Sequence, residues 1–456
     1  MWKNRPHLFP VEIQRRRSHI QVIVSEINLW DDGHYPGKSG KMGSFVGYQC
    51  SVCGKTFDSH YEGYVCDSCG GNLNVVLDYE NIRKNTKPAD IFASGEKSLW
   101  RYLPLLPVED PGFTETALHS AGYTPVYHSD SLAGAVGVGN LWIKDEGRNP
   151  TASFKDRASS ILIARAKEIG AETIATASTG NAGAALAGMA AASHWKAVIF
   201  APKTAPQAKI AQLLVFGAEV ILVDGNYDSA FDLSVEACDK YGWYCRNTGY
   251  NAFTAEGKKT AAFEIWEQIL CKRNSEKPLN IFVSVGDGNI ISGIHKGFKD
   301  LKELGWLPVM PRIFGVQSEK SAAIFNAWAA HTETITPVSA TTIADSISVD
   351  LPRDGVRAVR AATETNGAYI AIPDEAIYEG ISELGKIGVF AEPAGATAFA
   401  GMKKAVAMGL IDETDDVVVV NTGSGLKDVR SAMIAAGQAP VIAPAMDALA
   451  EYLKNK

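Results

Sequence analysis

A single lysine, Lys155, follows a phenylalanine in the stretch NPTASFKDRAS (149–159), just after an apolar run that reads as a strand. A lysine becomes a nucleophile only after it loses its proton, and both burial and a neighbouring cation favour that loss. Phe154 and Arg157 supply an apolar and a cationic neighbour, so the sequence predicts a lowered pKa for Lys155. A solvated side chain is the ordinary alternative for a lysine at the end of a strand.

Three glycine- and hydroxyl-rich stretches also follow expected strands: STGNAG (178–183), VGDGNIISG (285–293) and NTGSGLKD (421–428). In open parallel sheets, ligands bind beyond the carboxyl ends of the strands. The second stretch suits a phosphate, because Gly286, Asp287, Gly288 and Asn289 can turn successive backbone N–H groups toward an anion where a helix begins. It lacks the Gly-Lys-Ser/Thr of a Walker loop and the third glycine of the dinucleotide fingerprint.

Each of these loops could by itself be a tight turn with a helix cap. A lysine that faces a phosphate-binding loop across a cleft, however, is an arrangement that can hold pyridoxal phosphate as a Schiff base. The three loops and Lys155 together therefore favour an enzyme that carries this cofactor.

Four of the seven cysteines form two pairs, Cys50-x-x-Cys53 and Cys66-x-x-Cys69, with twelve residues between the pairs and glycine following each. Two such knuckles place four thiolates around one tetrahedral ion, which predicts a zinc ribbon, although iron would also fit. Four protein ligands leave no open position, so the site is expected to be structural. Disulfides are the alternative reading. Cys238, Cys245 and Cys271 are expected to pack in the core.

The chain has 456 residues, of which 46% are hydrophobic and 21% charged, and its formal net charge is −7. This balance argues against a nucleic-acid surface built from net positive charge. No segment reads as a signal peptide or a membrane span. The sequence therefore predicts a cytoplasmic enzyme that acts on a small molecule, with neither a nucleic acid nor a membrane as partner.

Short apolar runs alternate with helical patterns from Leu141 onward, which predicts parallel sheets covered on both faces. The runs that read as strands are NLWIK, TIATAS, AVIFAP, EVILVDG, WYCRNT, NIFVSVG (280–286), RIFGVQ (312–317), AYIAI (368–372) and DVVVVNTG (416–423). The helical patterns between the first five cover 154–169, 181–194, 206–217 and 227–241.

The expected fold is therefore α/β, with two doubly wound parallel-sheet domains and a small metal module in front. The predicted parts are an N-terminal extension (1–45), the four-cysteine ribbon (46–80), a smaller α/β domain (141–255) and a larger domain formed by 81–140 and 256–456.

Five motifs occur in an order and spacing that resemble the β-family, or fold type II, of pyridoxal phosphate enzymes, which includes tryptophan synthase β: NPTASFKDR, STGNAG, VGDGNIISG, EPAGATAFAG and TGSGLKD. Within this family the chain most resembles the threonine synthases, several of which carry a four-cysteine ribbon. The resemblance covers about residues 48 to 435. It implies a lyase of amino-acid metabolism and, by analogy, a homodimer.

The resemblance also implies a role for each matching residue. Lys155 would hold the cofactor and later move protons at the substrate Cα, and Asn181 would bind the phenolic oxygen of the cofactor ring. Gly286, Asp287, Gly288 and Asn289 would bind the cofactor phosphate. Thr422 would meet the pyridine nitrogen, and because a hydroxyl does not keep that nitrogen protonated, elimination and replacement are favoured over transamination. Ser178, Thr179 and Lys427 would contact the substrate.

Two positions depart from the threonine synthase pattern. Ala182 stands where the family usually has a threonine, and Thr254, in NAFTAEGKKT (251–260), stands where the family has an arginine; both family residues contact the substrate phosphate. The loss of one charge-assisted contact to a buried anion costs about 1.5–3 kcal/mol. Lys258, Lys259 and Lys427 are the candidates to replace these contacts.

Three functions therefore stay open at this point. A threonine synthase would convert O-phosphohomoserine and water to threonine and phosphate by α-deprotonation and γ-elimination. A β-elimination or β-replacement enzyme, such as a serine/threonine dehydratase or a cysteate synthase using phosphoserine and sulfite, would use the same cofactor residues. A non-catalytic protein whose ribbon recruits a partner is the third.

Overall fold

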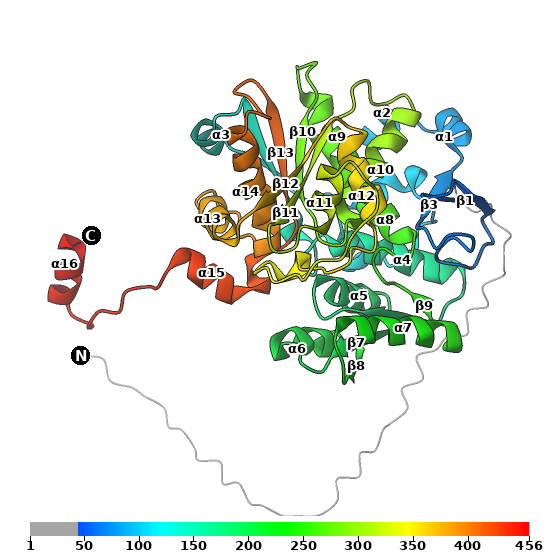
Figure 1. Ribbon diagram of the computed structural model, residues 1–456, viewed down its shortest axis with the longest axis horizontal. Coiled ribbons are helices and arrows are strands. Elements are labelled where there is room, and N and C mark those ends of the chain that lie inside the picture. The colour runs from blue at the N-terminus through cyan, green and yellow to red at the C-terminus, as the bar shows by residue number, and fades with distance from the viewer. Residues whose placement is uncertain (1–43, 456) are drawn as a thin grey trace, which may run out of the picture. The chain divides into compact units, whose positions relative to one another are not determined.

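The computed structural model describes residues 44–455 (Figure 1). The expected N-terminal extension, residues 1–45, therefore lies outside the described residues except for its last two. Within the described part of the chain, no helix combines the length and the apolar character that crossing a membrane requires.

A three-stranded antiparallel sheet in the order β2-β1-β3 carries the cysteine knuckles. Its strands are β1 (Phe45–Cys50), β2 (Thr56–Asp58) and β3 (Leu73–Leu77). β1 ends on Cys50, which is paired with Leu73 at the start of β3. The second knuckle lies in the connection between β2 and β3, so both pairs of cysteines meet at one end of this sheet.

A four-stranded parallel sheet, in the order β8-β7-β6-β9, follows in the chain. Its strands are β6 (Thr173–Ala177), β7 (Lys196–Pro202), β8 (Glu219–Val223) and β9 (Tyr244–Cys245). Its helices are α4 (Lys155–Glu168), α5 (Asn181–Ala192), α6 (Gln207–Val215) and α7 (Tyr227–Tyr241). Alternate strand residues face opposite ways: Ala175 and Val198 pack against α7, whereas Ile174 and Ile199 join the core that contains α4 and α5.

A six-stranded sheet in the order β12-β11-β10-β13-β5-β4 forms the larger layer (Figure 1). Its strands are β4 (Val126–His128), β5 (Asn140–Asp145), β10 (Asn280–Ser284), β11 (Arg312–Ser318), β12 (Tyr369–Ile372) and β13 (Asp416–Asn421). All neighbours are parallel except β4 and β5. Strands β10, β12 and β13 are buried throughout, as expected for a sheet that helices cover on both faces.

Two groups of helices cover this larger sheet. Side chains of α9 (Thr260–Gln268), α10 (Asn289–Glu303) and α12 (Gly355–Thr363) pack on one face with Ile281 and Val283. Side chains of α3 (Asp130–Val136), α13 (Asp374–Gly385) and α14 (Pro393–Ala407) pack on the other with Phe282 and Val419. The remaining α-helices are α1 (Tyr79–Asn85), α2 (Pro88–Phe92), α8 (Phe253–Lys258), α11 (Ala323–Ala329), α15 (Val429–Ala436) and α16 (Met446–Lys454).

The structure differs from the sequence expectations at two points. Strand β5, which was assigned to the smaller domain (141–255), pairs with β13 and so belongs to the larger sheet. Its apolar pattern predicted a strand but carried no information about which sheet it would join. Cys271 is exposed, whereas Cys238 and Cys245 are buried as expected. Cys271 lies in the short 3₁₀ turn Leu270–Lys272 after α9, and no residue of that turn is buried.

Candidate active site and metal centre

A cavity of about 460 Å³ lies where strands of both larger sheets end. This volume is typical of a site for a small molecule or cofactor. Nine of the ten residues predicted to bind cofactor or substrate line it; these are Lys155, Ser178, Thr179, Asn181, Gly286, Asp287, Gly288, Asn289 and Thr422. They lie in the loops after β5, β6, β10 and β13. The first of them, Lys155, and the last, Thr422, are 267 positions apart in the chain. The fold therefore brings together the loops that the sequence analysis singled out.

Lys155 is the first residue of α4, and the chain before it is fixed to the end of β13. The backbone N–H of Phe154 donates to the carbonyl oxygen of Thr422 at 2.9 Å, and Ser153 forms a β-bridge with Gly423. Burial lowers the pKa of Lys155 from 10.5 to about 8; nearby Glu392 opposes this shift and Arg246 adds to it. The lowered pKa was expected, but the neighbouring cation is Arg246 and not Arg157.

Arg157 points away into a buried ion cluster. Its guanidinium contacts Glu146 at 2.6 Å and also contacts Glu264, which pairs with Lys144 at 2.6 Å. The side chains of all four residues are fully buried. Arg157 is thus a structural residue, since its charge is already neutralised by two carboxylates.

Asn181 begins α5, and its side chain is held by a carboxylate that the sequence analysis did not assign to the site. The Asn181 Nδ2 atom donates to Glu392 Oε1 at 2.8 Å. Glu392 precedes Pro393, the first residue of α14; it lines the cavity and burial raises its pKa. A side chain at Gly423 would collide with the Glu392 carboxylate. Glu392 opens the motif EPAGATAFAG, but no role was assigned to it, because a Glu-Pro pair at a helix start is common without function.

The loop Gly286–Asn289 has the geometry of an anion site. Gly288 caps α10 at φ +90°, and a Cβ atom there would lie 2.6 Å from the carbonyl oxygen of Asp354, so only glycine fits. The Asn289 side chain accepts a hydrogen bond from Lys258 Nζ and donates one to Asp354 Oδ2 at 2.7 Å. Lys258 lines the cavity, and burial lowers its pKa well below the ordinary value. Free backbone N–H groups at a helix N-terminus beside a lysine favour a phosphate.

The structure separates the three lysines considered as replacements for the missing phosphate contacts. Only Lys258 lines the cavity. Lys259 pairs with Glu256 at 2.6 Å and Asp300 at 2.8 Å in the core. Lys427, the tenth predicted site residue, does not line the cavity and donates to Gln212 at 3.1 Å.

The two departures from the family pattern also differ in position. Ala182 lines the cavity, whereas Thr254 is fully buried behind it and donates to the carbonyl oxygen of Asn251 at 2.7 Å.

Arg246 is a second cation that the sequence analysis missed. It is fully buried after β9, and its Nη1 atom donates to Thr248, a cavity residue, at 2.6 Å. Its Nη2 atom has no hydrogen-bond partner among the described residues. Burial lowers its pKa to about 10. A buried guanidinium without a carboxylate partner is costly unless an anionic ligand neutralises it. The donor set of the cavity thus fits a ligand with a carbonyl group and a phosphate.

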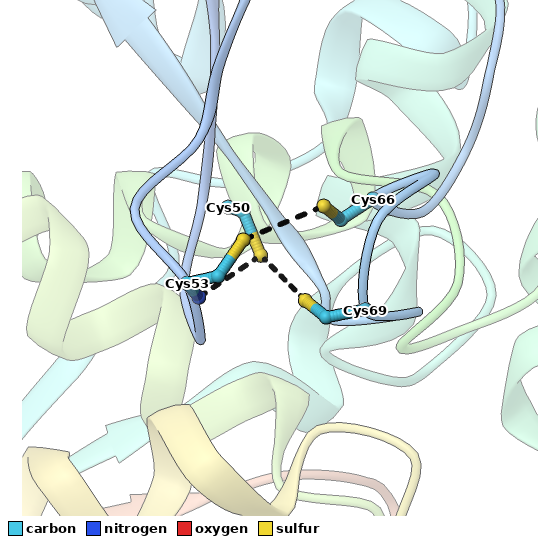
Figure 2. Close-up of side chains that lie close together, drawn as sticks. All are labelled: Cys50, Cys53, Cys66 and Cys69. Atoms are coloured by element: carbon cyan, nitrogen blue, oxygen red, sulfur yellow. Dashed lines mark hydrogen bonds between the residues drawn. The ribbon is translucent and has the colours of Figure 1, made fainter.

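The four cysteines of the knuckles lie together (Figure 2). All four sulfur atoms are within 4.8 Å of one another; Cys50 and Cys69 are 3.5 Å apart and Cys53 and Cys66 are 3.6 Å apart. Four thiolates around one tetrahedral zinc ion would be about 3.8 Å apart, given Zn–S bonds of about 2.3 Å. The cysteines are not disulfide-bonded. The cluster can therefore hold one metal ion.

Comparisons with known proteins agree with this site. Residues 118–423 match the family described as "Pyridoxal-phosphate dependent enzyme". The chain is 36% identical to a threonine synthase of Methanocaldococcus jannaschii, over 89% of this chain and 99% of that protein. It is 34% identical to a threonine synthase of Methanosarcina acetivorans, over 90% and 98%.

Solved structures with the same fold include threonine deaminase isoform 2 from Solanum lycopersicum. That likeness has a TM-score of 0.60 at 22% identity and covers 75% of this chain and 94% of that one. Diaminopropionate ammonia lyase from Escherichia coli has a TM-score of 0.59 at 22% identity, with 72% and 96% covered. At these identities the likeness concerns the fold alone.

Proposed function

Since the chain belongs to the pyridoxal-phosphate-dependent enzymes and, among them, to the threonine synthases, we propose that it converts O-phosphohomoserine and water to threonine and phosphate. The observation that carries this proposal is the 36% identity that extends over 99% of a threonine synthase. The cavity around Lys155 is the proposed site. It supplies a lysine of lowered pKa and an anion-binding loop in one small volume, and the guanidinium of Arg246 is bonded to Thr248 in its wall.

In this proposal Lys155 attaches pyridoxal phosphate, whose ring serves as an electron sink for negative charge at the substrate Cα. Residues Gly286–Asn289 and Lys258 hold the phosphate group, and Thr422 lies at the pyridine nitrogen. Glu392 orients the Asn181 amide toward the ring oxygen. Ser178 and Thr179 bind the substrate carboxylate. A free Lys155 amine would then take and return protons at the substrate Cα, as a general base with a pKa near neutrality does efficiently.

The substrate phosphate needs its own cation, because Ala182 and Thr254 cannot supply one. We assign this role to Arg246 acting through Thr248: the guanidinium lies behind the cavity lining and donates to Thr248, which lines the cavity, and its buried Nη2 atom has no hydrogen-bond partner among the described residues. A dehydratase acting on unphosphorylated serine or threonine would leave this guanidinium uncompensated. Arg246 therefore favours a phosphorylated substrate. It does not distinguish phosphohomoserine from phosphoserine, so a cysteate synthase is the second candidate.

We further propose that the four-cysteine cluster binds a structural zinc ion. The argument rests on the chemistry of four thiols that converge on one point, 3.5–3.6 Å apart in pairs. The homodimer and the cytoplasmic location remain predictions from the sequence, as does the division into domains apart from the place of β5.

The test supplies purified protein and pyridoxal phosphate with O-phosphohomoserine, O-phosphoserine, serine and threonine in separate reactions. Phosphate release is measured, and the amino-acid or keto-acid product is identified by mass spectrometry. We expect threonine and phosphate from O-phosphohomoserine only. Inertness toward it, with turnover of another substrate, would refute the threonine synthase assignment while leaving the cofactor chemistry intact.

Lys155→Ala serves as the control in this assay. The variant should show no Schiff-base absorbance and no phosphate release with any of the four substrates. A Schiff-base absorbance that persists in the variant would show that another amine holds the cofactor.

A further inference from the structure

The segment Arg353–Arg357 lies between the proposed phosphate loop and the four-cysteine module and is bonded to both. We propose that Asp354 and Arg357 are positioning residues that brace the loop Gly286–Asn289 against this module, so that metal bound to the cysteines increases the affinity for the cofactor phosphate. This inference rests on the proposed cofactor and on the proposed metal ion. It concerns binding of the cofactor and is independent of the substrate.

The first contact is between Arg357 and the module. The Arg357 Nη1 atom donates to the carbonyl oxygen of Leu73 at 3.1 Å and to Asn74 Oδ1 at 3.0 Å. Leu73 opens β3, four residues after Cys69, and is paired with Cys50 across the antiparallel sheet. Arg357 therefore contacts β3, the strand that follows one cysteine knuckle and pairs with the first cysteine of the other.

The second contact passes from Arg357 to the loop through Asp354. Two nitrogen atoms of Arg357 donate to the two carboxylate oxygens of Asp354 at 2.6 and 2.8 Å. Asp354 Oδ2 accepts from Asn289 Nδ2 at 2.7 Å, and Asn289 accepts from Lys258. Asp354 is fully buried and Arg357 nearly so. A bidentate pair in such surroundings has one favoured geometry, and loss of either partner leaves a buried charge.

A second, parallel route joins the same two regions. Asn72, which lies between Cys69 and β3, donates through Nδ2 to the carbonyl oxygen of Arg353 at 3.1 Å. The backbone N–H of Arg353 donates to Asp287 Oδ1 at 2.7 Å, and that of Asp354 donates to the carbonyl oxygen of Asp287 at 3.0 Å. Asp287 and Asn289 of the phosphate loop are thus both bonded to Arg353–Arg357, and the two routes end at Asn72 and Leu73, at the start of β3.

The metal would act through these routes because the module depends on it. A sheet of only three short strands closes around the four thiols, and in modules of this size the binding of metal contributes directly to folding. Without the ion, Leu73 and Asn72 are held to the knuckles by backbone hydrogen bonds alone, so their positions are less fixed. Arg357 then loses fixed acceptors, and the Asp354–Asn289 contact loses its support.

The test measures the dissociation constants of pyridoxal phosphate and of pyridoxal, which lacks the phosphate, in the full-length protein. Arg357→Gln should raise the Kd of pyridoxal phosphate about tenfold or more and leave that of pyridoxal within about twofold. Arg360→Gln is the matched control. Arg360 lies on the same helix and donates to Ser51 of the module, but its other partner is Glu333 and it makes no hydrogen bond to the loop. Its Kd values should stay close to those of the wild type.

Removal of the metal with a chelator should raise the Kd of pyridoxal phosphate in the wild type to a similar degree, with a smaller further rise in Arg357→Gln, where only the route through Asn72 and Arg353 remains. Asn72→Ala, a milder change at the module surface, should raise the Kd of pyridoxal phosphate by a smaller factor. It replaces Arg357→Gln as the test variant if that protein does not fold. Equal Kd values of pyridoxal phosphate for Arg357→Gln and Arg360→Gln would refute the proposed coupling between the four-cysteine module and the phosphate loop. So would an unchanged Kd in the metal-free wild type. Failure of the wild type to bind pyridoxal phosphate would overturn the cofactor assignment itself, whereas a wrong substrate would leave this test unaffected.

Discussion

Charges of both signs surround Lys155. Burial, together with Arg246, favours the neutral amine, whereas Glu392 and Asp287 favour the protonated form. At a pKa of about 8, roughly one amine in ten is neutral at pH 7, against fewer than about one in a thousand for an ordinary lysine. This balance makes the amine available for attack on a carbonyl group without any change of structure.

Two substitutions should move this balance in opposite directions. Capture of the cofactor requires the neutral amine, so its rate should rise with pH and reach half its maximum near the pKa of Lys155. Glu392→Gln removes the charge that raises this pKa, and its midpoint should shift to lower pH. Arg246→Met removes the charge that lowers the pKa, and its midpoint should shift to higher pH. The measurement is the rate of Schiff-base formation, followed by absorbance, as a function of pH.

Asp228→Asn is the control for these two variants. Asp228 also lines the cavity, but it is largely exposed and pairs with Arg353 at 3.1 Å. Its removal should leave the midpoint unchanged. Shifts of the same sign in Glu392→Gln and Arg246→Met would contradict the electrostatic account.

At the residue scale, the sequence predicted those site residues that lie within motifs. Lys155, Asn181 and the glycines of the phosphate loop are recognisable because each stands in a short stretch of distinctive composition. Glu392 also opens a motif, EPAGATAFAG, but its role and that of Arg246 were not predictable, since both roles depend on contacts between distant segments. The Asn181–Glu392 hydrogen bond, for example, joins residues 211 positions apart.

At the scale of elements, the turn from β10 into α10 determines the shape of the phosphate loop. Gly288 has φ +90° and has no room for a Cβ atom, because that atom would lie 2.6 Å from the carbonyl oxygen of Asp354. Gly305, after the other end of α10, has φ +76° but open space around it. The same helix thus offers two glycines that differ only in their surroundings.

Gly288→Ala should therefore weaken cofactor binding, and Gly305→Ala should not. Both substitutions place alanine in the left-handed region, at a cost of about 1–2 kcal/mol in the free energy of unfolding. Only Gly288→Ala also displaces Asp354, and we expect its Kd for pyridoxal phosphate to rise at least tenfold. Equilibrium binding and urea unfolding of the two variants separate these effects. An equal change of Kd in both would show that backbone strain alone matters.

The elements themselves followed closely from hydrophobic pattern. The helical patterns at 154–169 and 227–241 correspond to α4 (Lys155–Glu168) and α7 (Tyr227–Tyr241). The run WYCRNT was only partly a strand: β9 contains two residues, and the chain then leads to Thr248, which lines the cavity. The hydrophobic pattern of a sequence indicates which residues are buried and how often they recur along the chain, but not which strands become neighbours in a sheet. For that reason the place of β5 in the larger sheet could not be predicted.

At the scale of the whole molecule, the buried cluster of Lys144, Glu146, Arg157 and Glu264 joins β5, α4 and α9. Two backbone N–H groups, those of Tyr123 and Thr124, also donate to the Glu264 carboxylate. Although burial alone would raise it, the two cations hold the pKa of Glu264 down at about 2. The cluster is thus a charged core at the place where the segments before and after the smaller sheet meet.

Glu264→Gln should lower the free energy of unfolding by about 3–5 kcal/mol, because it leaves Arg157 and Lys144 with too little negative charge. Glu303→Gln is the matched control: Glu303 pairs with Arg83 at 2.8 Å on the surface, and its loss should cost at most about 1 kcal/mol. Urea unfolding measures both. Similar values for the two variants would show that the buried cluster contributes little.

The same cluster predicts that the free energy of unfolding depends on pH in the acidic range. The stability that Glu264 contributes is fully present above its unfolded pKa of 4.5 and is lost as the pH falls toward 2, the folded value. Between these limits the wild type should lose stability more steeply than Glu264→Gln. Parallel curves of unfolding free energy against pH would rule out this contribution.

Strand β5, which leads to Lys155, has only one parallel partner in the larger sheet, β13, and the hydrogen bond from Asn421 to Asp145 that accompanies this pairing spans 276 positions. A ribosome therefore releases β5 long before it makes the strand that β5 requires. Contacts over such long separations form late in folding. Throughout synthesis the reactive amine consequently lacks a finished cavity, and only a nearly complete chain can acquire its cofactor.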